Sequence, residues 1–302
     1  MTVIIAFVAN ILVALAKSAA AVVTGSASMV AEAAHSWADA GNEVFLLIAE
    51  RSSSRKPDAE HPLGFGRDAY VWSLFAAVGL FTAGAVVSVQ HGITELLDPE
   101  PAQDYLVAYI VLAVAAVLEG VSFTQSVVQV RRGARKFSRG ALDYALNGSN
   151  PTLRAVLAED AAALAGLAIA FLGILLHQLT GDPVYDAVGS LAIGGLLGVV
   201  AIVLINRNRR FLVGEVPTPA VRAAVGSALA EHPEIERVTY LHLEFVGPAK
   251  LFVVAAVDLT GDRREDDVAL QLRTLERAIE ENELMQKVVL TLSVKDEPTI
   301  GF

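Results

Sequence analysis

One apolar stretch of the chain carries four ionisable side chains at regular intervals. They follow one another three or four residues apart and are Glu32, His35, Asp39 and Glu43. This spacing places all four on one stripe of an α-helix. His35 and Asp39 are one turn apart, so an imidazole nitrogen and a carboxylate oxygen can bind one divalent cation at about 2.0–2.2 Å. The pattern predicts a metal site on this helix.

A second apolar stretch contains two adjacent acids, Glu159 and Asp160. Neighbouring residues of a helix diverge by about 100°, so the two carboxylates cannot point equally at one ion. We expect Asp160 to bind the metal with His35 and Asp39. Glu159 stays open between the fourth ligand, with water as the alternative, and a residue that supports the ligands or carries protons. Nitrogen and oxygen ligands favour Zn²⁺, with Mn²⁺, Fe²⁺ and Co²⁺ as alternatives, over Ca²⁺ or Mg²⁺.

These polar residues also have structural interpretations. A single His or Asp in a membrane helix can serve an interhelical hydrogen bond. Charge in lipid is costly, however, so a stripe of four groups plus an acidic pair favours a transport path. Glu32 and Glu43 are candidates for carrying protons along it. Three further residues stay open: Lys17 and Glu119 between a buried salt bridge, snorkelling and a transport role, and Asn42 between a helix–helix hydrogen bond and orienting a ligand.

The composition indicates that a membrane domain positions these residues. Of the 302 residues, 54% are hydrophobic and only 19% are charged, and the mean hydropathy is +0.52; a soluble domain normally carries more charge. A spanning helix needs about 20 apolar residues. We therefore predict an all-α bundle of six spans, the first a true span rather than a cleaved signal peptide. The predicted spans are 3–24, 27–50, 69–96, 102–130, 152–178 and 184–205.

Charged residues sort by side between these spans. Basic residues collect at one set of ends: Arg51, Arg55, Lys56, Arg67, Arg131, Arg132, Arg135, Lys136, Arg139, Arg207, Arg209 and Arg210. The opposite ends carry acids alone: Asp98, Glu100, Asp104 and Asp182. Because positive residues stay in the cytoplasm, both termini are expected there. The Ala- and Val-rich composition is typical of a bacterial inner (plasma) membrane protein.

The last third of the chain has the pattern of a small soluble domain. We predict a transmembrane domain over residues 1–210 and a cytoplasmic C-terminal domain over 211–302, opening with a proline-rich joint at Pro217 and Pro219. The predicted elements are a helix at 220–231, strands at 237–245 and 250–259, a helix at 266–281 and a strand at 287–294. This αββαβ order predicts an α+β, ferredoxin-like domain with its helices on one face of the sheet.

Several function classes are disfavoured. The chain has no cysteine, hence no thiolate metal site. Its formal charge of −10 argues against nucleic-acid binding. No H-E-x-x-H or nucleophile–base motif is present, so we expect a secondary transporter with no tightly bound cofactor rather than an intramembrane metalloenzyme. A passive cation channel and a metal sensor remain as rivals.

Two segments carry a family resemblance. Residues 24–39, TGSASMVAEAAHSWAD, and 57–67, PDAEHPLGFGR, resemble the second span and following loop of the cation diffusion facilitator family. The resemblance, which covers nearly the whole chain, implies a homodimeric exporter that exchanges divalent metal for protons by alternating access. It implies a His/Asp-x-x-x-Asp pair on the second span, matched by His35 and Asp39, and another on the fifth. There Asp160 matches, but Val156 occupies the other position, so Glu159 is the residue that can compensate.

The resemblance also implies two accessory sites. Asp58 and His61 match part of a zinc site that some relatives have in this loop, but Phe65 stands at the third position, and a polar loop capping the next helix is the alternative. A binuclear site in the tail of some relatives has few counterparts here. The candidates are His232, His242, Asp296 and Glu297, so we expect a weak tail site or none, with dimerisation as the tail's main role.

Overall fold

The computed structural model describes residues 2–99, 104–136, 139–261 and 263–302, without the side chains of residues 2–6, 9 and 136. Glu100, the Lys136 side chain and the predicted start of a span at 102 therefore lie outside the described part. The chain forms two compact units. One comprises the residues up to Arg51 together with Tyr70–Arg209, and the other comprises Ser52–Ala69 together with Arg210–Phe302.

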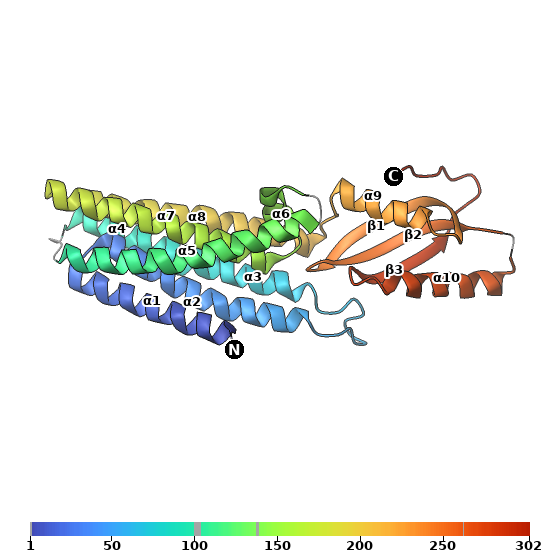
Figure 1. Cartoon of the computed structure of the whole chain (residues 1–302), viewed down its shortest axis with the longest axis horizontal. Helices are drawn as coiled ribbons and strands as arrows, with labels where there is room; N and C mark the ends of the chain where they lie inside the picture. The colour runs from blue at the N-terminus through green and yellow to red at the C-terminus, as the bar shows by residue number, and fades with distance from the viewer. Residues whose placement is uncertain (1, 100–103, 137–138, 262) are drawn as a thin grey trace. The chain divides into compact units, whose positions relative to one another are not determined.

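The first unit is a bundle of long helices that run lengthwise beside one another (Figure 1). Four of its α-helices are unbroken over 27 to 32 residues, and α1 has 23 residues. The third long segment changes to π-helical geometry for seven residues, which the sequence pattern did not indicate. A short helix also lies in the predicted polar loop. The elements are α1 (Thr2–Thr24), α2 (Ala27–Ser53), α3 (Asp68–Gly79), η1 (Leu80–Val86), α4 (Val87–Leu97), α5 (Tyr105–Lys136), α6 (Ala141–Asn147), α7 (Pro151–Thr180) and α8 (Val184–Val213).

Four segments of the described chain are long and apolar enough to cross a membrane: Asp68–Leu97, Tyr105–Arg135, Pro151–Thr180 and Val184–Val213. The apolar part of α1, Asn10–Thr24, is shorter. The remaining helix, α2, is less apolar because it carries the ionisable stripe. A membrane helical domain is thus established, whereas membrane crossing by α1 and α2 stays a prediction.

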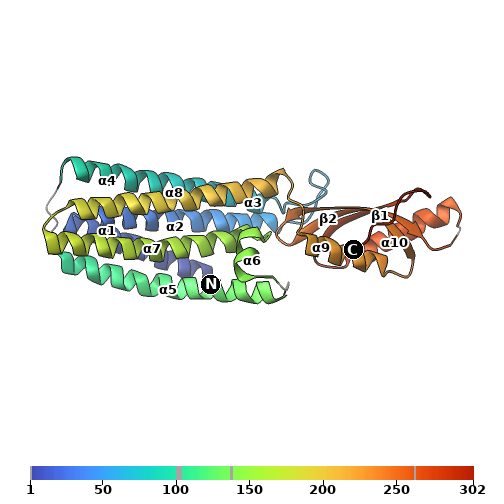
Figure 2. The same cartoon turned by 90° about the horizontal axis from the view of Figure 1, so that it is seen from above.

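Small residues bring the helices of the bundle together. A Cβ atom at Gly194 of α8 would lie 2.7 Å from Cγ2 of Val89 and 2.9 Å from the carbonyl oxygen of Ala85. Glycine therefore lets α8 approach α4 and η1 at backbone distance, as in other closely packed membrane helices; Figure 2 shows α4 and α8 side by side. Ser28 fixes the start of α2 by donating from Oγ to the carbonyl oxygen of Asp186 at 2.9 Å.

The second unit contains a three-stranded sheet. Its elements are α9 (Pro219–Ala230), β1 (Ile235–Gly247), β2 (Lys250–Leu259), α10 (Glu265–Glu280) and β3 (Met285–Leu292), the αββαβ order predicted from sequence. Strand β2 is central, antiparallel to β1 and parallel to β3. Leu229 of α9 and Leu275 of α10 join one hydrophobic cluster with alternate residues of β2, so both helices cover the same face of the sheet.

The segment 52–69 packs within this second unit, which the sequence pattern did not indicate. A Cβ atom at Gly66 would lie 2.5 Å from the carbonyl oxygen of Val246 and 2.8 Å from Cα of Gly247. Arg67 also pairs with Glu244 of β1. The loop after α2 is therefore held at the β1–β2 turn by a backbone contact that only glycine allows.

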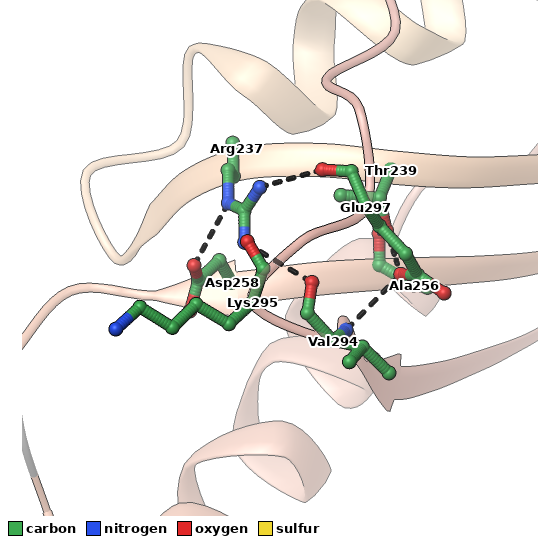
Figure 3. A network of polar contacts seen from close by, with 7 residues as sticks. All are labelled: Arg237, Thr239, Ala256, Asp258, Val294, Lys295 and Glu297. Atoms are coloured by element: carbon green, nitrogen blue, oxygen red, sulfur yellow. Dashed lines mark hydrogen bonds and ion pairs between the residues drawn. The ribbon is translucent and has the colours of Figure 1, made fainter.

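A polar network fixes the C-terminal segment against β1 (Figure 3). Arg237 donates from Nε to Asp258 at 2.9 Å and from Nη1 to the carbonyl oxygen of Glu297 at 2.8 Å. Thr239 donates to Oε2 of Glu297 at 2.8 Å. This hydrogen bond is the main reason why the pKa of Glu297 lies below its ordinary value.

Candidate metal transport site

Helix α2 turns its ionisable stripe toward the interior of the bundle. Glu32 and His35 are fully buried, and the side chain of Asp39 is 18% exposed. On the other side of the helix, Trp37 and Val44 are exposed. The helical period thus separates a polar inner face from an apolar outer face, as expected for a helix that lines a path through a bundle.

A cavity of about 430 Å³ lies between α1, α2, α5 and α7. Five carboxylate side chains from three of these helices line it: Asp39 and Glu43, Glu119, and Glu159 and Asp160. The two acidic segments that the sequence singled out therefore face the same space. Glu119, which the sequence left open, joins them there.

Hydrogen bonds position three of these carboxylates. Asp160 accepts from Ser122 Oγ at 2.9 Å and also from Ser126 of α5. Glu159 accepts from Asn42 Nδ2 at 3.1 Å. In each case a polar side chain of a neighbouring helix holds the acid. Asn42 thus forms a helix–helix hydrogen bond, one of its two interpretations, and that it orients a metal ligand stays a prediction.

A further amide holds Glu43: Asn10 Nδ2 donates to its Oε2 at 3.0 Å. The sequence analysis missed Asn10, Ser122 and Ser126. The sequence gives one signal for them, since each is a polar residue within an apolar helix. Many residues that belong to no site have the same property.

His35 lies one turn from the cavity wall rather than in it. Its Nδ1 is 3.5 Å from Oδ1 of Asp39, and neither ring nitrogen has a hydrogen-bond partner within the described structure. A buried imidazole without partners is energetically costly. Its position beside Asp39 agrees with the one-turn spacing in the sequence.

The predicted ligands are close to one another but do not form a preassembled coordination shell. Over the described residues, no three His, Asp or Glu side chains are grouped so that they could hold one metal ion. Asp39, Glu159 and Asp160 line the cavity, whereas His35 does not line it and lies next to Asp39. Direct ligation by these four residues stays a prediction.

Glu32 has a partner of its own. Lys17 Nζ of α1 donates to its Oε2 at 2.8 Å, and both side chains are fully buried. The sequence left three interpretations open for Lys17. In the structure Lys17 forms the buried salt bridge to the stripe. A signal for it existed in the sequence, because Lys17 and Glu32 are almost equally distant from the turn at Gly25 and two antiparallel helices bring such positions together.

The two accessory candidates lie on the surface of the second unit. Asp58 Oδ1 is 3.2 Å from Nδ1 of His61 and accepts from the backbone N–H of His61 at 2.7 Å and of Glu60 at 3.1 Å. The hydrogen bond from the His61 backbone contributes most to a lowered pKa of Asp58. Phe65 packs against the His61 ring at 4.3 Å between centroids. Asp58 and His61 thus belong to a local turn, and the ring of Phe65 packs against it.

The tail candidates lie apart in different contexts. His242 Nε2 is 3.8 Å from Glu244 on the surface of β1. The ring of His232 lies at the end of α9, where its Nδ1 accepts from the backbone N–H of Glu234 at 3.4 Å. Glu297 belongs to the network around Arg237.

Comparisons with known proteins agree with the geometry of the bundle. The family model described as the cation efflux transmembrane domain matches residues 3–213. The chain is 38% identical over 245 residues to the mitochondrial proton-coupled zinc antiporter SLC30A9 of Xenopus laevis, covering 81% of this chain and 44% of the relative.

Two further relatives match over a similar part of the chain. Identity is 36% over 233 residues with metal tolerance protein C4 of Arabidopsis thaliana, covering 77% of this chain and 51% of the relative. It is 26% over 260 residues with the probable cation efflux system protein Rv2025c of Mycobacterium tuberculosis, covering 84% and 72%. The chain thus spans about half the length of the first two relatives.

Proposed function

Because this chain belongs to the cation efflux family, also called the cation diffusion facilitators, we propose that it exports Zn²⁺ by proton antiport with alternating access. One observation carries the proposal: carboxylates from α2, α5 and α7 line a single cavity inside a helical bundle. Members of the family are transporters, not enzymes, and relatives named as zinc antiporters support both the ion and the proton coupling.

In the proposed cycle, His35, Asp39 and Asp160 bind the metal in deprotonated form, with Glu159 or water as fourth ligand. Assembly of this shell requires His35, which lies beside Asp39, to turn toward the cavity that Asp39, Glu159 and Asp160 line. On the far side protons compete for the same ligands and release the metal. Coupling requires that the two open states bind the ions with different affinity.

Protons need a route that does not occupy the metal ligands. Glu43 lines the cavity with Asn10 beside it, and Glu119 lines it from α5, so these acids are suited to pass protons. Glu32 contributes differently, since its charge is neutralised by Lys17. We propose that this pair keeps the buried end of the stripe electrically neutral.

The same proposal includes six spans with both termini in the cytoplasm, a homodimer joined through the C-terminal domain, and a bacterial inner membrane as the location. The distribution of basic residues at the helix ends supports the orientation. Zn²⁺ is preferred over Mn²⁺, Fe²⁺ and Co²⁺ because of the mixed imidazole and carboxylate ligands.

Metal uptake by proteoliposomes with an imposed pH gradient tests the proposal, metal by metal. Asp39→Asn and Asp160→Asn keep the side-chain volume but remove a ligand charge, and zinc flux should fall at least about tenfold in each. Asp182→Asn is the matched control, since this acid lies on the α7–α8 connection, where it accepts from the backbone N–H of Val184.

Three results would contradict the proposal. Unaltered flux in both ligand variants removes the site assignment. Flux that is indifferent to the proton gradient and does not saturate identifies a passive channel. Metal binding without any flux identifies a sensor.

A further inference from the structure

A second cavity lies within the second unit, and it shares no lining residue with the acidic cavity of the bundle. Its volume is about 350 Å³, and it lies between the segment that follows α2 and the β1–β2 turn. Three cationic residues line it, Arg55, Lys56 and Lys250, and no acidic residue does. The remaining polar lining comes from Ser53, Ser54 and Gln286.

The walls of this pocket are held in place. Gly66 and Gly247 approach so closely that a Cβ atom at either would overlap the opposite backbone. A Cβ atom at Gly64 would lie 3.3 Å from the amide nitrogen of Gln286. Phe65 and Val246, both buried, form the apolar floor. The pocket is therefore part of the packed unit rather than a gap under a loose loop.

Two of the three cationic side chains make a contact that leaves N–H donors available for a ligand. The guanidinium of Arg55 lies over the Phe65 ring at 3.8 Å, which leaves its in-plane N–H groups available. Lys250 Nζ donates to the carbonyl oxygen of Glu283 at 2.6 Å and has two more N–H donors. Lys56 forms no ion pair within the described residues. Like charges that share one pocket repel each other, and a bound anion relieves this repulsion.

We propose that this pocket binds a phosphate-bearing anion. Arg and Lys side chains with hydroxyl and amide donors are the groups that recognise phosphate oxygens in proteins. The volume exceeds that of a bare phosphate and accommodates an esterified one. The pocket lining includes Ser53, the last residue of α2, and clustered Lys and Arg side chains attract the phosphates of anionic lipid headgroups as well as those of soluble esters. Its ligand is thus either an anionic lipid headgroup or a soluble phosphate ester.

Binding to the purified full chain in detergent distinguishes these two sources. Native mass spectrometry counts adducts of phosphatidylglycerol against phosphatidylcholine, and calorimetry measures inorganic phosphate and glycerol phosphate. Selective phosphatidylglycerol adducts alone identify a lipid site, while binding of the soluble phosphates alone identifies a soluble ligand. Binding of neither probe by the wild type overturns the proposal.

Substitutions that each remove one positive charge test whether the anion binds in this pocket. Lys56→Gln and Lys250→Gln should each weaken binding about fivefold, in line with the attraction of one lysine to an anionic surface. Lys295→Gln is the matched control, because this exposed lysine lies outside the pocket. Lys56→Gln breaks no described contact, so its result does not depend on a folding defect. Equal binding by Lys56→Gln and Lys295→Gln would refute the assignment. The inference does not depend on zinc transport, since each binding measurement is made without metal.

Discussion

Two ion pairs of nearly equal length occupy opposite environments in the two units. Lys17 and Glu32 meet at 2.8 Å in the helical bundle with no exposure of either side chain. Arg237 and Asp258 meet at 2.9 Å on the sheet of the second unit, where their side chains are 21% and 42% exposed. Water screens the second pair and not the first. Similar geometry therefore gives different energies, because breaking a buried pair leaves an uncompensated charge whereas an exposed pair contributes little.

The comparison also explains where each unit can do chemistry. In the bundle, carboxylates that are largely buried gain most from binding a cation, so the acidic cavity is suited to hold one. In the second unit, exposed charges mostly serve attachment, as in the network around Arg237 and the contact between Arg67 and Glu244. The pocket beside Lys56 is the exception, since cations line it without an acid.

The largest expected effect comes from breaking the buried pair. Glu32→Ala leaves the Lys17 ammonium buried without its partner and should destabilise the protein by about 3–5 kcal/mol. Thermal unfolding of the full chain in detergent measures this loss. Asp258→Ala at the exposed pair is the control and should cost only about 0–1 kcal/mol.

A double variant separates charge from packing in that experiment. Lys17→Met with Glu32→Ala removes both charges and should recover much of the stability lost in Glu32→Ala alone. If the double variant unfolds as easily as the single one, the lost volume beside Gly166 rather than the unpaired charge is responsible.

An intermediate effect is expected where the loop contacts the β1–β2 turn. Gly66→Ala forces a Cβ atom into the backbone of Val246 and Gly247 and should cost about 1–3 kcal/mol. Limited trypsin digestion reports the result, since release of the loop lets the Arg55–Lys56 peptide bond enter the protease active site, whereas the bond after Lys56 precedes Pro57 and is not cut. Gly301→Ala, where a Cβ atom meets nothing within 4 Å, should digest like the wild type. Unchanged cleavage in Gly66→Ala would mean that the contact does not hold the loop.

The smallest effect concerns the exposed network at the C-terminal segment. The lowered pKa of Glu297 means that its ionised form is stabilised by folding, so this contribution is present above its ordinary value of 4.5 and is lost as the pH falls through the folded value. Hydrogen exchange of the Val294 amide, which donates to Glu297 at 3.1 Å, should accelerate in acid relative to the Leu251 amide, which donates to the carbonyl oxygen of Leu284 at 2.8 Å. Glu297→Gln should remove this pH dependence, and an unchanged pH dependence in that variant would exclude Glu297 as its origin.

The sequence by itself determined the features that depend on local periodicity. The spacing from Glu32 to Glu43 placed those side chains on one inner stripe, since the helical period is a property of each segment alone. The αββαβ order and the family resemblance followed from the same kind of local pattern, and both are confirmed. That Asp39 and Asp160 face one space was expected on chemical grounds and agrees with their shared lining of the cavity.

Only the tertiary structure decided which groups meet across elements. The pairing of Lys17 with Glu32, the support of Glu159 by Asn42 and of Asp160 by Ser126, and the attachment of the loop at Gly66 all depend on the rotation and depth of one element against another. Such contacts join residues up to 181 positions apart, as Gly66 and Gly247 are, and no local period encodes them. The pocket that we assign to an anion arises in the same way, because its lysines approach only when the loop packs against the turn.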